Sequence, residues 1–200
     1  PEPGGARLGP FHLAPGTTPR NAATLLFGTF STIGLVTFIT FVNPYMFHLV
    51  GVPSDQQGAL SGLLVSLQEL TVVVLGAGLG AWSDHVGRRP LLMAGLGILA
   101  LGFVLYPLAP TVAWLVPLRL LYSVGMAAVI VMLSASIAEY TAERSRGRWM
   151  GTVGLCNGLG VVVTAAVLAK LPLALARLGF DEATALRLSF WLLALVALGL

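Results

Sequence analysis

Charged residues are scarce in this sequence. Of its 200 residues only 10% are Asp, Glu, Lys or Arg, and 56% are hydrophobic. Ordinary soluble domains carry about 25% charged residues. A soluble domain of this size could not bury so much apolar surface, because its outside must contact water. Together with a mean hydropathy of +0.89, the composition predicts a membrane protein.

Several functional patterns are absent as well. Cys156 is the single cysteine, which excludes a disulfide framework within the chain. No phosphate loop of the G-x-x-x-x-G-K-[ST] type and no H-E-x-x-H pattern occurs. The three histidines lie far apart, without metal-ligand spacing. The basic residues are scattered in short connectors, unlike a nucleic-acid surface. We therefore expect no enzyme activity, no cofactor, no metal site and no nucleic-acid partner.

What the chain does have is a series of apolar runs. A transmembrane helix needs roughly 20 apolar residues, and five runs meet that length. We expect an all-α, polytopic transmembrane bundle within residues 22–200, preceded by a flexible tail over the Pro- and Gly-rich residues 1–21. A sixth run stops short of a full span, so the sequence is expected to be a fragment. The predicted spans are about 22–42, 58–83, 90–109, 111–138, 150–169 and a truncated 187–200.

The basic residues of the connectors predict the orientation. Cytoplasmic loops carry an excess of Lys and Arg. An amino terminus in the cytoplasm places seven Arg inside and three basic residues outside. We therefore expect a cytoplasmic amino terminus, in the lipid bilayer of a bacterial inner membrane. The inside set is Arg7, Arg20, Arg88, Arg89, Arg144, Arg146 and Arg148, and the outside set is Lys170, Arg177 and Arg187.

The connector between the second and third runs concentrates ionisable groups in the segment GAWSDHVGRR, residues 80–89. Two Arg can fix topology, and Gly87 allows a positive φ between antiparallel helices. Acids contribute little to topology, which leaves Asp84 unexplained. The segment resembles the signature G-x-L-[AS]-D-[RK]-x-G-[RK]-[RK] of the major facilitator superfamily, between its second and third spans. Trp82 replaces its Leu, and His85 replaces its Arg or Lys.

A second segment, RLLYSVGMAA at residues 119–128, is similar to the fourth-span pattern R-x-x-x-G-x-G-x-[AG]-x of proton-coupled members. The resemblance implies that residues 22–200 are the amino-terminal six of twelve spans, and that the carboxy-terminal six-helix half is missing from this chain. It also implies alternating access, driven by an ion such as the proton. Leu159 stands where drug–proton antiporters of the superfamily carry a Pro, which argues against drug export. By the same resemblance, the gating loop that latches the two halves contains Gly80, Asp84, Gly87, Arg88 and Arg89.

Two ionisable residues, Glu69 and Arg119, lie inside predicted spans, where they are costly and usually functional. Their expected depths differ by about 5 Å, so they can meet directly or through water. We interpret them as the ion-coupling groups. The alternative is a structural ion pair that only orders the bundle.

The first span carries a polar stripe of Thr29, Thr32, Thr40 and Asn43, which share one arc at helical spacing. With Gln68 and Asn157, this stripe is the predicted path for a small-molecule or ion substrate. The alternative is that the Thr hydroxyls bond their own helix backbone. Two other functions stay open for the whole chain, a non-transporting scaffold or sensor on the same fold and a self-dimerising half-size transporter.

Overall fold

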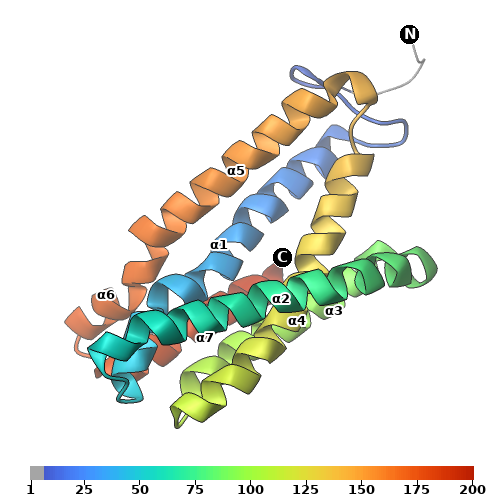
Figure 1. Ribbon diagram of the computed structural model, residues 1–200. Coiled ribbons are helices and arrows are strands. Elements are labelled where there is room, and N and C mark those ends of the chain that lie inside the picture. The colour runs from blue at the N-terminus through green and yellow to red at the C-terminus, as the bar shows by residue number, and fades with distance from the viewer. Residues whose placement is uncertain (1–6) are drawn as a thin grey trace.

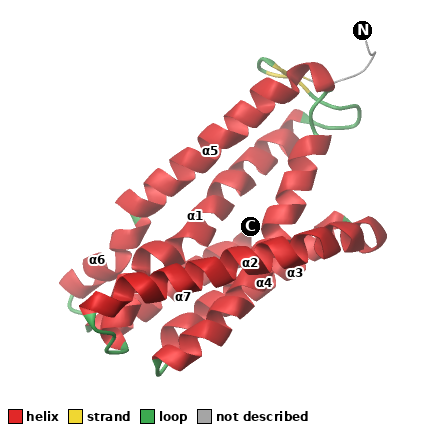
Figure 2. Ribbon diagram, in the orientation of Figure 1, coloured by secondary structure: helices red, strands yellow, loops and turns green. Residues whose placement is uncertain are grey.

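The computed structural model describes residues 7–200, which form a bundle of long helices (Figure 1). Six helical stretches are long and apolar enough to cross a membrane, with α5 to α6 counted as one. Helices account for nearly all of the described backbone (Figure 2). They are α1 (Pro19–Leu49), α2 (Ser54–Val86), α3 (Arg88–Leu105), α4 (Val112–Glu139), α5 (Arg146–Ala166), α6 (Leu171–Arg177) and α7 (Glu182–Gly199), with the turns η1 (Tyr106–Leu108), η2 (Glu143–Ser145) and η3 (Leu168–Lys170).

The predicted all-α class is confirmed, and the observed helices extend beyond the predicted runs. The helix α1 continues past Pro44, which membrane helices tolerate when neighbours satisfy the freed backbone groups. The helix α7 begins at Glu182, five residues before the predicted 187, and has 18 residues. Its start was missed because Glu182, Thr184 and Arg187 interrupt the apolar pattern at its beginning.

Asp181 caps the amino terminus of α7. Its side chain accepts a hydrogen bond of 3.0 Å from the backbone N–H of Thr184. The Thr184 hydroxyl and N–H together hold the pKa of the Asp181 carboxyl below its usual range. Because the pKa is lowered on folding, this cap stabilises α7 at pH values above the ordinary carboxyl pKa. The stabilisation is lost as the pH falls through the lowered pKa.

The core lies between α1, α3, α4 and α7. Aromatic rings from all four helices meet there, with Phe38 and Phe190 centroids 5.2 Å apart and Phe103 and Tyr122 centroids 5.5 Å apart. The helices α3 and α4 approach closely because Gly95 and Gly125 face each other across the seam. A Cβ on Gly125 would lie 2.8 Å from the Gly95 carbonyl oxygen. Small residues allow such close helix contacts inside membranes.

The helices α2 and α5 lie at the edges of the bundle, α5 alongside α1 and α2 across α4 (Figure 1). Half of the central residues of α1, α3 and α4 are buried, compared with 11% in α2 and 17% in the stretch from α5 to α6. Large apolar side chains stay exposed on both helices, among them Val73 on α2 and Leu155 on α5. These two helices therefore present the least covered surfaces of the chain.

The amino-terminal segment differs from the flexible tail predicted over residues 1–21. Strands β1 (Arg7–Leu8) and β2 (Phe11–His12) form a hairpin, and Leu13 pairs with Thr141 in the connector between α4 and α5. The Phe11 ring packs against Trp149 at 5.3 Å, and Leu13 is buried. Residues 7–14 are thus fixed on the α4–α5 connector, and α1 begins within the predicted tail. The first six residues of that tail lie outside the described residues.

Candidate functional site

The α2–α3 loop is a single residue, Gly87, with φ = +92°. Only glycine adopts this left-handed backbone region readily, which explains the Gly in the motif. The Ser83 hydroxyl donates a hydrogen bond of 2.6 Å to the Gly80 carbonyl oxygen, within the last turn of α2. Asp84 and His85 are exposed at the end of that helix. The loop therefore holds its acid and its arginines at the rim of the bundle.

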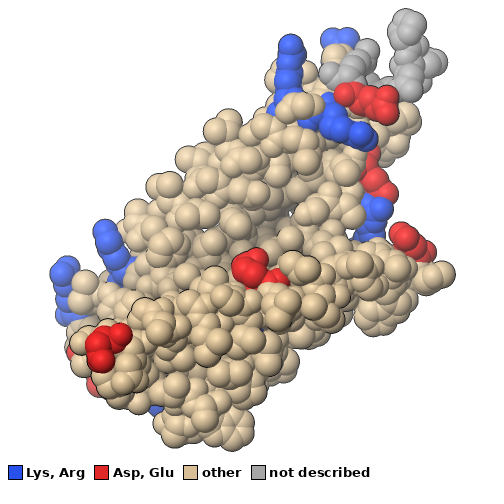
Figure 3. Space-filling model, in the orientation of Figure 1, with Lys and Arg blue, Asp and Glu red and all other residues tan. Residues whose placement is uncertain are grey.

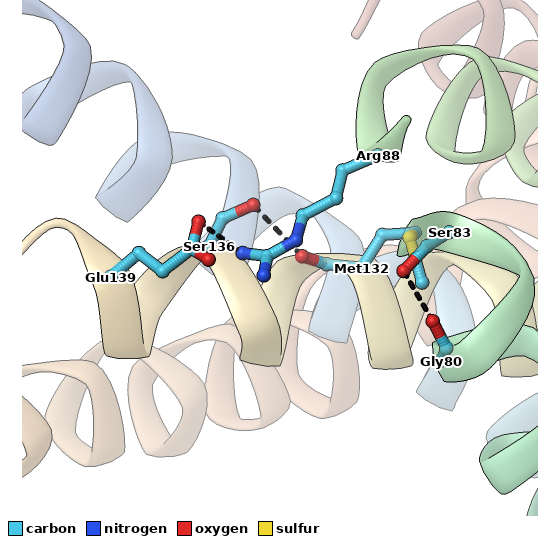
Figure 4. A network of polar contacts seen from close by, with 6 residues as sticks. All are labelled: Gly80, Ser83, Arg88, Met132, Ser136 and Glu139. Atoms are coloured by element: carbon cyan, nitrogen blue, oxygen red, sulfur yellow. Dashed lines mark hydrogen bonds and ion pairs between the residues drawn. The ribbon is translucent and has the colours of Figure 1, made fainter. Parts of the chain in front are cut away.

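Arg88 pairs with Glu139, the last residue of α4 (Figure 4). The Arg88 side chain is 30% exposed and that of Glu139 is 58% exposed, so solvent screens part of their attraction. The ion pair ties the start of α3 to the end of α4. Sequence reasoning missed Glu139, because the predicted fourth span ended at residue 138 and the acid just beyond it matched no motif.

A cavity of about 750 Å³ opens beside this ion pair. Arg88, Arg89, Glu139 and Tyr140 line it, together with Asn21 from α1. Charged side chains on the visible face gather toward the two ends of the bundle, apart from a small acidic patch midway (Figure 3). The loop thus combines a charge cluster with a hollow at one end of the bundle.

A second cavity, of about 270 Å³, lies between α1, α4 and α5. Thr29, Thr32 and Asn157 all line it, as does Ser134, which was not predicted. Three residues of the predicted path therefore meet at one hollow. The Thr29 hydroxyl donates to the Leu25 carbonyl oxygen at 2.7 Å, as the backbone-bonding alternative expects.

The other half of the polar stripe belongs to a separate cluster around Arg119. Arg119 is fully buried, and its Nη2 donates to the Thr40 hydroxyl at 3.2 Å. Its guanidinium carbon lies 5.5 Å from the centre of the Tyr122 ring, a cation–π distance. The Tyr106 hydroxyl donates to Asn43 Oδ1 at 3.2 Å. Thr40 thus contacts the buried cation directly, Asn43 reaches it through Tyr106, and neither residue lines the cavity that Thr29 and Thr32 share.

Glu69 and Arg119 have different partners in this structure. The buried Gln68 donates from Nε2 to Glu69 Oε1 at 3.3 Å, while Glu69 itself is exposed on α2. Glu69 is exposed while Arg119 is fully buried, and no ion pair joins these two described side chains, so their expected contact is not made in this conformation. The coupling role of the two residues stays a prediction.

Comparison with known proteins identifies the family. The sequence profile of the Major Facilitator Superfamily matches residues 25–200. The chain belongs to the major facilitator superfamily. This superfamily consists of membrane transporters and not of enzymes, in agreement with the loop motif and the six spans.

Individual relatives are similar over part of their length. The class G tetracycline resistance protein of Vibrio anguillarum is 38% identical over 111 residues, 56% of this chain and 28% of the relative. The inner membrane transport protein YajR of Escherichia coli strain K12 is 31% identical over 139 residues, 70% of this chain and 28% of YajR. The magnetosome protein MamH of Paramagnetospirillum magneticum is 27% identical over 147 residues, 68% of this chain and 34% of MamH. The aligned region thus spans about a third or less of each of these superfamily relatives.

Proposed function

We propose that this chain forms the amino-terminal half of a secondary active transporter, which moves a small solute by alternating access. The observation that carries the proposal is the hollow between α1, α4 and α5, whose mainly apolar walls carry the four polar side chains Thr29, Thr32, Ser134 and Asn157. Transporters of this kind bind their substrates between two halves that rock around the site. These four side chains are the proposed contacts along the solute path, with Gln68 as a further polar group on α2.

The sparse burial of α2 and α5 supports a second six-helix half as partner. Apolar side chains such as Val73 and Leu155 are exposed on these helices, and a second bundle would cover part of their surface. In this proposal the amino terminus is cytoplasmic, as the distribution of arginines favours. The α2–α3 loop then lies at the cytoplasmic side, where Asp84, Arg88 and Arg89 latch the two halves in one state and release them in the other.

The driving force in this proposal is an ion gradient, with the proton as the coupling ion. Glu69 is the proposed coupling acid, because it is an acid within a membrane-spanning helix and intramembrane acids commonly serve proton relays. In this proposal, the change between the two states brings Glu69 close enough to the buried Arg119 for their charges to interact. Leu159 departs from the pattern of drug–proton antiporters, but the relatives named as tetracycline resistance proteins still make tetracycline the first solute to try.

A transport assay on the full-length protein tests this proposal. The protein is reconstituted into vesicles holding a pH-sensitive dye, and tetracycline and other candidate solutes are added across a proton gradient. We expect solute-dependent proton flux for the wild type and at least a tenfold loss in Glu69→Gln, because the amide cannot exchange a proton. The matched control is Glu182→Gln, which removes an exposed acid at the start of α7 and should transport normally. Undiminished flux in Glu69→Gln would exclude this residue as the coupling acid, and a wild type inert to every solute would favour a scaffold.

A further inference from the structure

The cluster around Arg119 holds more hydrogen-bond donors than acceptors. A guanidinium carries five N–H donors and no acceptor. Arg119 Nη2 donates to the Thr40 hydroxyl, and the Tyr106 hydroxyl also interacts with the guanidinium, while Nε and Nη1 are buried without a hydrogen-bond partner. Asn43 Nδ2 is a further buried donor without an acceptor. Two nitrogen atoms of the buried cation and the amide nitrogen of Asn43 therefore lack an acceptor.

No carboxylate of the described chain neutralises this cation. Among the described side chains, Glu139 pairs with Arg88, and Glu69 is exposed and accepts a hydrogen bond from Gln68. Arginine cannot shed its proton in a protein, so the charge persists. An unpaired buried charge is among the most costly groups to place away from water. The Tyr122 ring at 5.5 Å offsets only part of that cost.

The side chains of the Arg119 cluster are held in place by three segments of the core. Thr40 and Asn43 come from α1, Tyr106 from η1, and Arg119 and Tyr122 from α4, so three segments converge on it. Arg119 lies about 10 Å along α4 from its first residue, Val112, which places it within the span. The site is thus a buried, donor-rich and positively charged group of side chains, held by the packing of the core.

We propose that the Arg119 cluster binds a small monovalent anion. Such an ion supplies both the negative charge and the accepting lone pairs that Arg119 Nε, Arg119 Nη1 and Asn43 Nδ2 lack. The anion has two possible sources, a free inorganic ion such as chloride or the carboxylate of a transported solute. Binding itself is independent of the proposed transport function. Only the assignment of the anion to the solute rests on it.

Thermal unfolding of the purified full-length protein tests the proposal. The unfolding midpoint is followed against the concentration of chloride or of acetate, with ionic strength kept constant by sulfate. A ligand that binds only the native state stabilises it in a saturable way. We expect a saturable rise in the wild type and none in Arg119→Gln. The matched control, Arg187→Gln, removes an exposed cation from α7 and should keep the full response.

A second variant covers the case in which Arg119→Gln does not fold. Thr40→Asp places a carboxylate where the Thr40 hydroxyl now accepts from Arg119. This built-in anion should give a folded protein whose unfolding midpoint no longer responds to chloride or acetate. A response to both ions supports a free-ion site, and a response to acetate alone supports a solute carboxylate. The proposal would be overturned if the unfolding midpoint of the wild type responded to neither anion, or if it responded equally in the wild type and in Thr40→Asp. Either result would count whatever the transport assay shows.

Discussion

Gly125→Ala is expected to destabilise the protein by about 3 kcal/mol, at the upper end of the range for overpacking a well-packed core. The added Cβ would lie 2.8 Å from the Gly95 carbonyl oxygen and 2.9 Å from Leu99 Cα. These atoms belong to the backbone of α3 and cannot rotate away as a side chain does. The helices must therefore separate, which loosens the contacts along the whole α3–α4 seam.

The matched control for this prediction is Gly97→Ala on α3. A Cβ at Gly97 would meet nothing within 4 Å. Alanine favours a helix over glycine by roughly 1 kcal/mol, so this variant should be as stable as the wild type or more so. Unfolding of both variants in mixed detergent micelles measures the difference. Equal stability of the two alanine variants would contradict the close approach of α3 and α4.

Reversing one charge of the Arg88–Glu139 pair is expected to impair transport strongly. Arg88→Glu replaces an attraction between the start of α3 and the end of α4 by a repulsion. Because both side chains are partly exposed, solvent limits the change to about 1–2 kcal/mol. A shift of that size alters the ratio of two states by a factor of about 5–30. If this ion pair is part of the gate, turnover should fall by a similar factor.

The double variant with Arg88→Glu and Glu139→Arg is the control, because it restores the opposite charges in reversed order. Transport by this double variant should recover most of the lost turnover, and high salt should reduce the defect of the single variant. Turnover is measured on the reconstituted full-length protein at low and high ionic strength. A double variant as slow as Arg88→Glu would show that the loop needs these particular side chains and that the charge pair is not what gates it.

The long helices were predictable from the sequence because apolar runs of about 20 residues carry a strong signal. The tight α2–α3 turn was predictable from the local pattern around Gly87, since a left-handed residue between two helices favours glycine. The exact ends of the helices were not predictable, because polar capping residues such as Asp181 lie outside the apolar pattern. The hairpin of residues 7–12 was not predicted for another reason. Phe11 of the hairpin packs on Trp149, and the adjacent Leu13 pairs with Thr141, so the segment is held by residues more than a hundred positions away.

The sequence could predict which residues belong to the candidate site, but it could not predict which of them lie together. Helical spacing placed Thr29, Thr32, Thr40 and Asn43 on one arc, yet they belong to two different environments. Periodicity reports the direction of a side chain and not which neighbour stands opposite at each depth. The partner of Arg88 could not be predicted either, because Glu139 is about fifty residues away in the sequence and only the packing of α3 on α4 brings it close.

Alternating access itself is tested most directly by labelling the proposed solute path from each side of the membrane. A cysteine at Asn157, on the wall of the hollow between α1, α4 and α5, is introduced into the full-length protein with Cys156 and any other cysteine replaced. A membrane-impermeant maleimide is then applied to right-side-out and to inverted vesicles. We predict labelling from both faces, with the two rates shifting in opposite directions when a proton gradient is imposed. Labelling from one face alone under every condition would contradict alternating access.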